Sequence, residues 1–461
     1  MRTAAGHASS LGRWPVALSH WGAMGIVCCF GVLGQPQPTA AQQAASGADD
    51  AARAPLMERT RALEWAVENN YGIRIARTNL AIARRNVSVG NAGFLPDLSA
   101  VASQNRLVGG PGLFGRQQVF SRTELGLRLN WVAFAGLGRF ATYDRLEATY
   151  EAERLRVEAD VESVLVDVST AYWNVVRQQQ LLEAVQESQR LSQQRVDIAE
   201  QRLEAGVGSQ LDANLARVEL YQDRSAVAEQ RIALTASKTR LNRLLGRAAD
   251  TPFRARAEFG IQASLRYERL RQAALERNRR LRVARQQKQA AAEAVAEARA
   301  ERWPTVGMDL GYVYQGFHDG FVPPFDVAPG LQLGVSIDIP LFRGFNIGRQ
   351  VQNAVSRANA SELAVQQERT RVDEQVRNAY AAYRQNRRRV QMTADAVRVA
   401  EQNVDIALTQ MQAGTISQIE LRQVQLDLLN ARTRHIAAKF ETMQAQVELG
   451  RLSGRLYEEL L

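Results

Sequence analysis

The sequence predicts a mixed α and β fold that is mostly α, internally duplicated, and built on long coiled-coil-like helices with four short strands per chain. Three observations predict it. Landmark residues recur at one fixed offset, two very long stretches contain no Gly or Pro, and four short segments alternate apolar and polar side chains.

The N-terminal segment, residues 1–41, has the order of a secretory signal peptide, because a basic region precedes an apolar stretch and then an Ala-rich zone. Residues 42–55 follow as an N-terminal linker. Both cysteines, Cys28 and Cys29, lie in the apolar stretch. Lipid modification of either is disfavoured, because Val27 is larger than the small residue that such acylation requires before the Cys.

A duplication governs the rest of the chain. Landmarks of the first half recur 208 residues later in the same order, so neither half carries an insertion relative to the other. This register predicts a first repeat at 56–246, an inter-repeat linker at 247–262, a second repeat at 263–454 and a C-terminal tail at 455–461. The matched landmarks include Pro96 and Pro304, Ala171-Tyr172 and Ala379-Tyr380, Val196–Ala199 and Val404–Ala407, and Gly246 and Gly454.

Each repeat begins with a helical pattern and continues into two strands. In the first repeat the helix is predicted at 56–92, and an alternating strand begins after Pro96. A Gly- and Pro-rich loop at 106–122 leads to a second alternating strand that ends at Phe134. The second repeat has the same order, with its second strand ending at Phe342.

A very long helix follows the strands in each repeat. Residues 139–205 and 349–413 contain no Gly or Pro, and helices of this length would reach roughly 100 Å. Each ends at an Ala-Gly stop, at Gly206 or Gly414, and turns at once into a return helix. Helices this long need lateral bracing, which apolar residues at heptad spacing indicate. These residues are Val161, Val164, Val168, Ala171, Val175, Leu182, Val185, Val196, Ala199 and Leu203, and Val372, Val376, Ala379, Tyr383, Val390, Val397, Ala400, Val404, Ala407 and Met411.

The second strand of each repeat has one apolar and one polar face. This alternation is equally typical of a half-buried soluble sheet, which the strand pattern alone favours. Two features reverse that preference in favour of a membrane-spanning sheet. The chain carries an export signal, and the sequence predicts no other segment that could cover a soluble sheet. The side chains predicted to face lipid are Leu125, Leu127, Leu129, Trp131, Leu333, Val335, Ile337 and Ile339.

A membrane-spanning sheet must close on itself, because lipid offers no partner for edge N–H and C=O groups. Four strands are too few to close, but three copies of the chain would supply twelve, with the polar faces lining a wet lumen. The fold class predicted is therefore a transmembrane β-barrel of twelve strands carried on long helices.

Other classes of protein find little support in the composition. We see no catalytic motif, and four His and two Cys in 461 residues disfavour a metal centre or a cofactor. The formal net charge of +10 is compatible with binding to a nucleic acid. Two observations disfavour that function: acidic residues are interleaved along the helices, and the signal peptide predicts export from the cytoplasm. The remaining alternative is a secreted or periplasmic coiled-coil scaffold protein without channel activity.

Together the landmarks resemble the TolC-type outer-membrane efflux proteins, the outer-membrane channels of tripartite efflux and type I secretion systems. The resemblance covers nearly all of the chain after the signal peptide. Its carrying residues are Pro96 and Pro304, the Phe-x-Gly motifs at 134–136 and 342–344, the mid-helix Ala-Tyr pairs at 171–172 and 379–380, and the hairpins at 206–212 and 414–420.

The resemblance implies a homotrimer with a twelve-stranded barrel in the outer membrane, continued through the periplasm by a trimeric α-barrel that is closed at its inner tip. It also implies docking onto a periplasmic adaptor (membrane fusion) protein and an inner-membrane pump of the RND or ABC type. Drugs, metals or polypeptides would be the exported substrates, and the sequence does not choose among them.

The resemblance places an acidic gate at the tip, which assigns that role to Glu420 with Asp212 as its first-repeat counterpart. Gln423 stands where the family often has a second acid. Both acids are also placed to cap a helix, being third after Ser209 or Ser417, so capping and gating both remain open. Adaptor docking would use the two hairpin turns, Gly206, Val207, Gly208 and Ser209, and Gly414, Thr415, Ile416 and Ser417.

Overall fold

The computed structural model describes residues 55–108, 119–256, 259–262, 264–318 and 330–458. The predicted signal peptide with Cys28 and Cys29, and most of the predicted strand-joining loops, lie outside these residues. Among the described residues, no helix combines the length and the apolar character needed to cross a membrane.

Each repeat begins with two short helices instead of the one that the sequence predicted. In the first repeat Asn70 separates them, and its side-chain oxygen accepts a hydrogen bond from the N–H of Ile73, which caps the second helix. The Nδ2 group of Asn70 donates to the C=O of Leu244, at the end of the return helix, at 2.7 Å. Asn278 repeats both contacts in the second repeat. The helices are α2 (Arg59–Asn69), α3 (Tyr71–Asn86), α6 (Tyr267–Arg277) and α7 (Arg279–Ala300).

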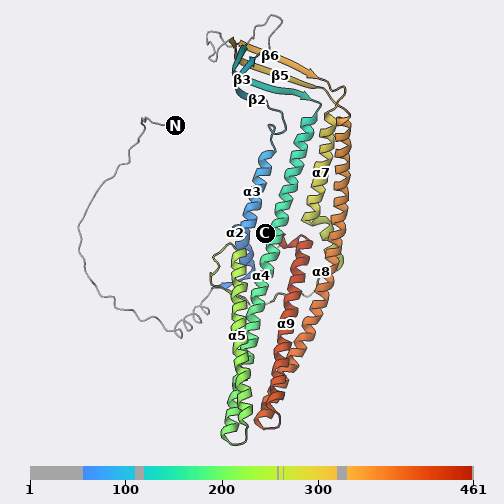
Figure 1. Cartoon of the computed structure of the whole chain (residues 1–461). Helices are drawn as coiled ribbons and strands as arrows, with labels where there is room; N and C mark the ends of the chain where they lie inside the picture. The colour runs from blue at the N-terminus through green and yellow to red at the C-terminus, as the bar shows by residue number, and fades with distance from the viewer. Residues whose placement is uncertain (1–54, 109–118, 257–258, 263, 319–329, 459–461) are drawn as a thin grey trace, which may run out of the picture. The chain divides into compact units, whose positions relative to one another are not determined.

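The long helices and their return helices are confirmed. Helices α4 (Gly138–Glu204) and α8 (Asn346–Gln412) each have 67 residues. The return helices α5 (Gln210–Leu244) and α9 (Gln418–Leu452) each have 35 residues. Figure 1 shows the strands at one end of α4 and α8 and the two hairpin turns at the other end. A four-residue helix, α10 (Arg455–Glu458), follows α9.

The two hairpins pack against each other through α4 and α9. Contacts run from α5 to α4, from α4 to α9 and from α9 to α8, so α5 and α8 lie at the two flanks of this part of the chain. Closer to the sheet, α3 and α7 pack on α4, and α7 also packs on α8. The heptad prediction is confirmed, because none of its twenty residues is exposed.

The largest hydrophobic cluster surrounds the middle of α4, where Tyr172 is fully buried. The Tyr172 hydroxyl donates to the C=O of Met57 and accepts from the N–H of Arg256, both at 3.1 Å. These contacts hold a parallel two-stranded sheet of β1 (Leu56–Met57) and β4 (Arg254–Ala255). The predicted linker 247–262 therefore contains a strand that sequence analysis missed, because two residues are too few to show a period.

The four predicted strands form one antiparallel sheet in the order β2-β3-β5-β6, so the two repeats are joined by the pairing of β3 with β5. Strands β2 and β6 are the open edges. The bounds are β2 (Asp97–Val108), β3 (Val119–Ala135), β5 (Thr305–His318) and β6 (Gly330–Asp338).

The end predicted for the last strand is wrong. Strand β6 ends at Asp338, four residues before Phe342, and Ile339 lies one residue beyond it. The reason is Pro340, which has no N–H to continue the ladder and stands where the first repeat has Val132. Strand β3 continues instead across a bulge between Val132 and Phe134.

Candidate gate and lipid-facing surface

Both hairpin turns have the same backbone conformation. Gly206 and Gly414 have φ values of +73° and +78°, which suit Gly and end the long helices. The N–H of the next residue donates back to the helix at 2.9 Å, from Val207 to the C=O of Arg202 and from Thr415 to the C=O of Gln410. This is the Schellman arrangement that the Ala-Gly stops predicted.

The residues predicted to dock an adaptor lie at these turns, and six of the eight are exposed. The exceptions are Gly208 and Ile416, which occupy the same place in the two repeats and are half-buried. The guanidinium of Arg202, near the end of α4, donates to the C=O of Met411, near the end of α8, at 3.4 Å, so the ends of the two long helices are in contact next to the turns.

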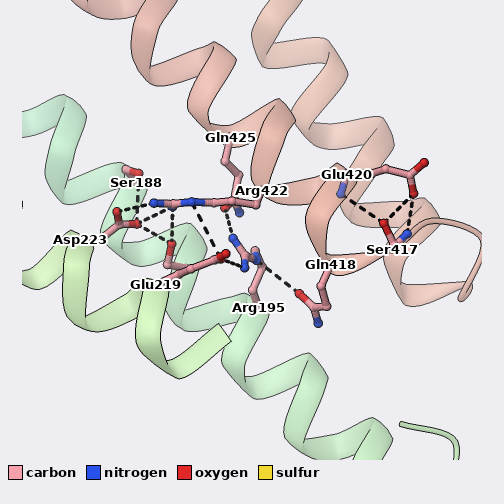
Figure 2. Close-up of polar contacts among 10 residues, drawn as sticks. Ser188, Arg195, Glu219, Asp223, Ser417, Gln418, Glu420, Arg422 and Gln425 are labelled. Atoms are coloured by element: carbon pink, nitrogen blue, oxygen red, sulfur yellow. Dashed lines mark hydrogen bonds and ion pairs between the residues drawn. The ribbon is translucent and has the colours of Figure 1, made fainter. Parts of the chain in front are cut away.

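Glu420 forms a capping box with Ser417. The Glu420 carboxylate accepts from the Ser417 N–H at 2.7 Å, and the Ser417 hydroxyl accepts from the Glu420 N–H at 3.3 Å. These hydrogen bonds to the ionised form lower the pKa of Glu420, which is therefore charged at neutral pH. Figure 2 shows this box at the start of α9.

Asp212 and Gln423 are placed differently from Glu420. The Ser209 side chain accepts from the N–H of Leu211, and Asp212 lies exposed in the first turn of α5, where its charge complements the helix dipole. The Gln423 side chain donates to the carboxylate of Asp427, one turn further along α9, at 3.0 Å. The sequence predicts a reciprocal capping box in both repeats, but only the second repeat has one.

A buried ionic network joins the two hairpins in the part of the helices next to the turns (Figure 2). Arg422 of α9 donates to both carboxylate oxygens of Asp223 of α5, at 2.9 and 3.0 Å. Ser188 and Ser192 of α4 also donate to this carboxylate. Burial alone would raise the pKa of Asp223, but the hydrogen bonds from Arg422 and Ser192 outweigh it, so the pKa lies below its ordinary value.

Arg195 of α4 forms the second half of this network. Its side chain is only 1% exposed and forms an ion pair with Glu219 of α5. It also donates to the side-chain oxygens of Gln425 at 3.0 Å and Gln418 at 3.4 Å, both on α9. Three helices from the two hairpins therefore share one desolvated cluster, and we call it the inter-hairpin network.

The inter-hairpin network was not predicted from the sequence. A signal for it was present, because three of its four charged residues depart from the repeat, whereas Glu219 corresponds to the acidic Asp427. At an offset of 208, Arg195 corresponds to Asn403, Asp223 to Ala431, and Asn214 to Arg422. Two residues of opposite charge whose counterparts in the other repeat are uncharged, such as Asp223 and Arg422, indicate a contact between the repeats.

Seven of the eight predicted lipid-facing residues share one face of the sheet, and Ile339 lies one residue beyond the end of β6. In the register, Leu125 lies opposite Tyr314, Leu129 opposite Leu310, and Leu310 opposite Leu333. None of the eight residues is buried in the chain, and Leu333 is 77% exposed. The opposite face carries an ion pair between Glu124 and Arg128. Among the described residues, no group of His, Cys, Asp and Glu is arranged to hold a metal ion.

Comparison with known proteins gives matches over most of the chain. The family described as outer membrane efflux protein matches residues 62–247 and 270–455, one match for each repeat. Protein CyaE of Bordetella pertussis is 26% identical over 405 residues, which are 85% of this chain and 84% of CyaE. The fold is similar to that of the Campylobacter jejuni CmeC outer membrane channel, with a TM-score of 0.72, 16% identity, and coverage of 86% of this chain and 85% of CmeC. The Vibrio cholerae outer membrane protein VceC gives a TM-score of 0.70 at 18% identity, over 86% of this chain and 96% of VceC.

Proposed function

The chain belongs to the outer membrane efflux protein family, and from that premise we propose that it is the outer-membrane channel of an export system and works as a homotrimer. Members of this family are channels rather than enzymes. The proposed trimer would form a twelve-stranded barrel in the outer membrane and an α-barrel across the periplasm. Its partners would be a periplasmic adaptor and an inner-membrane pump of the RND or ABC type.

The observation that carries the trimer is a pair of exposed apolar stripes on the two flanks. On α8, Met392, Val399 and Ile406 recur every seven residues and are at least half exposed. On α5, Leu211, Val218 and Ile232 fit the same heptad spacing and are equally exposed. A heptad stripe that nothing covers in one chain predicts a partner helix.

The two stripes differ and lie at opposite flanks of one chain, so the contact that covers them is heterologous. A heterologous contact propagates until it closes into a ring. The sheet has the same requirement, because its edges β2 and β6 leave backbone groups unpaired and lipid cannot satisfy them. Three copies with α5 against the neighbour's α8, and β2 against the neighbour's β6, would satisfy both.

Disulfide cross-linking tests this arrangement, because residues 42–461 contain no Cys. Ile232 and Met392 lie at similar heights above their turns, roughly 30–35 Å along the helices. We expect the double variant Ile232→Cys with Met392→Cys to give covalent trimers from the outer-membrane fraction, and each single variant to give only monomers on the same gel. A detergent-free soluble monomer or dimer would favour the coiled-coil scaffold instead.

Within this channel we propose that the hairpin tips form the gate and that the turns dock the adaptor. Three copies of Glu420 and Asp212 around a narrow axis would concentrate negative charge at the tip. The inter-hairpin network supports the proposal, because it would fix one hairpin of each chain to the other just above the constriction. Conductance measurements on tip variants, described in the Discussion, test this role.

A further inference from the structure

A cavity of about 480 Å³ lies where the end of α9 meets α4 and α6. Helix α10, which follows α9, packs against both α9 and α4 there (Figure 1). None of the described residues that line the cavity belongs to α5 or α8, so the cavity is built within one chain and away from its two flanks. Its volume falls in the range of roughly 300–1,000 Å³ that small-molecule sites occupy. We call it the α9–α10 cavity.

One wall of the α9–α10 cavity is aromatic and is fixed in place. Trp173 of α4 stacks on Phe259 of the linker, with ring centroids 5.3 Å apart. The side chain of Gln446 on α9 accepts from the N–H of Gln262 at 3.0 Å and donates to the C=O of Gly260 at 3.3 Å. These two hydrogen bonds attach the linker to α9, so the wall does not need a ligand to hold its position.

The other side of the cavity is basic. Arg59, Arg256 and Arg455 all line it, and no acid is found among its described lining residues. Arg256 is paired with Glu58 at 3.0 Å. Arg59 and Arg455 form no ion pair with any acid in the part of the chain that the structure describes. The cavity therefore combines an aromatic wall with two available guanidinium groups.

The first repeat shows what fills the equivalent space. Four lining residues correspond to first-repeat residues at the offset of 208; they are Leu265, Leu449, Ser453 and Arg455, which correspond to Met57, Leu241, Leu245 and Arg247. The first three of these first-repeat residues belong to one buried cluster with Phe253, which is 1% exposed. The guanidinium of Arg247 lies over the Phe253 ring, 5.9 Å from its centroid. An aromatic ring thus lies between an apolar wall and an arginine in the first repeat.

The described part of the second repeat leaves this space open. Phe253 corresponds to Leu461, which lies outside the described residues. Ser453 also has a smaller side chain than its counterpart Leu245. The Ser453 hydroxyl donates to the C=O of Leu449 at 2.8 Å, so it is satisfied within its own helix end. What remains is a space for an aromatic ring next to Arg455.

We propose that the α9–α10 cavity binds an aromatic anion. The ring of this ligand would take the place that Phe253 takes in the first repeat, and its carboxylate or sulfonate would pair with Arg455 and Arg59. Burial of the ring and its contact with a guanidinium both favour binding, and arginine suits an anion with two oxygens because it can donate two parallel hydrogen bonds. The site is distinct from the proposed gate and from the sheet, and it goes beyond the proposed export function.

Calorimetric titration with naphthalenesulfonate tests the proposal. The full protein would be held in nanodiscs of uncharged phospholipid, and the heat of titrating empty nanodiscs would be subtracted. We expect saturable binding of one probe per chain. Arg455→Gln should weaken the affinity several-fold, because it removes the charge that pairs with the sulfonate. The matched control is Arg247→Gln, at the first-repeat position where Phe253 already fills the space, and it should leave the affinity unchanged.

Two further variants identify where the probe binds. Ser453→Leu restores the first-repeat residue and should abolish binding by filling the cavity. A chain shortened by residues 459–461 should bind as the full chain does. Binding that appears only after shortening would overturn the proposal in favour of the chain's own tail as the occupant. Equal affinity of the wild type, Arg455→Gln and Ser453→Leu would place the probe elsewhere, and absence of binding to every form would also refute the site. None of these results depends on the trimer, so a failure here is distinguishable from a failure of the proposed channel.

Discussion

In the first repeat the turn after α4 exposes Val207 and continues through Gly208, where a Cβ would come within 2.8 Å of the backbone N of Leu203. In the second repeat Ile416 occupies the position of Gly208 and packs onto the cluster of Met411 and Leu421. The second turn is thus tied to its own hairpin by an apolar side chain, whereas Gly208 at the corresponding position of the first turn has no side chain to pack. The two tips therefore differ in packing.

The two repeats have the same residues at the starts and ends of their helices, and they have different residues where the two hairpins pack against each other. Asn70 and Asn278 cap equivalent helices, and Gly206 and Gly414 end equivalent helices. The inter-hairpin network has no equivalent, because α4 packs on α9 whereas α5 and α8 are left at the flanks. Because this contact exists once per chain, the corresponding residues of the other repeat do not need to form it and are free to differ. The departures from the repeat therefore point to the contacts that make the hairpins unequal.

The largest loss of stability is expected when Arg422 of the inter-hairpin network is replaced. Arg422→Ala would leave the carboxylate of Asp223, 7% exposed, without its bidentate partner. We expect a loss of about 3–5 kcal/mol in the free energy of unfolding, as for one partner removed from a buried ion pair. Urea unfolding of the detergent-solubilised protein, followed by circular dichroism, measures this loss.

The matched control is Asn214→Ala, at the first-repeat position that corresponds to Arg422. Asn214 is exposed, so we expect a change within about 0.5 kcal/mol. Equal losses for the two variants would contradict the asymmetry between the hairpins.

A smaller effect, equal in the two repeats, is expected on the sheet. Leu129 and Ile337 correspond at the offset of 208 and lie on the apolar face. Leu129→Arg and Ile337→Arg should each cost about 2–4 kcal/mol if both face the bilayer near its midplane. The yield of folded protein in the outer-membrane fraction measures this cost, with Asn130→Arg on the opposite face as the control. Loss for Leu129→Arg alone would show that β6 is not closed into a barrel.

The stability of the chain is expected to depend on pH through Glu162 of α4, which lies against the start of α7. Burial raises the pKa of Glu162 to about 7, although Arg279 and Arg451 oppose the shift. Because the pKa of Glu162 is higher in the folded state than in the unfolded state, protonation of Glu162 stabilises the fold. This stabilisation is complete below about pH 4.5 and is lost as the pH rises to about 7. At about 1.4 kcal/mol per pKa unit, the total is roughly 3 kcal/mol.

Unfolding free energies of the wild type and of Glu162→Gln, measured from pH 4 to 8, test this expectation. The wild type should lose stability relative to the variant as the pH rises through this window. Thr370, the counterpart of Glu162 in the second repeat, carries no charge, so Thr370→Val should leave the pH profile unchanged. Parallel profiles for the wild type and Glu162→Gln would refute the assignment.

Most of the fold was predictable because its signals are periodic. The heptads of α4 and α8 and the alternation in β3 each extend over many residues, and the Ala-Gly stops recur at the same place in both halves. The breaks at Asn70 and Asn278 were not predicted, although the two residues correspond at the offset of 208, because one Asn in a helical pattern is ambiguous between a cap and an exposed side chain. The bulge in β3 left no pattern, and Pro340 was overlooked within the last strand.

The candidate site was predictable only in its local part. The turns and Glu420 follow from short motifs, since a capping box is encoded within four residues. The inter-hairpin network joins Arg195 to Gln425 across 230 positions, and such a contact depends on which faces of α4 and α9 meet. A single sequence does not specify those faces, although the departures from the repeat narrow the choice.

The smallest effect on stability and the most direct test of the gate concern Glu420 and Asp212. Both acids are exposed, and only Glu420 forms a capping box, so Glu420→Ala should lower Tm slightly and Asp212→Ala should hardly change it. If the two acids also ring the constriction, the double variant should raise single-channel conductance in planar bilayers, and by more than either single variant does. Gln423→Ala is the control, because its side chain is bonded to Asp427 on the same helix and carries no charge. Unchanged conductance with a lowered Tm would leave Glu420 with capping alone, and the difference between the two tips would then lie in packing rather than in charge.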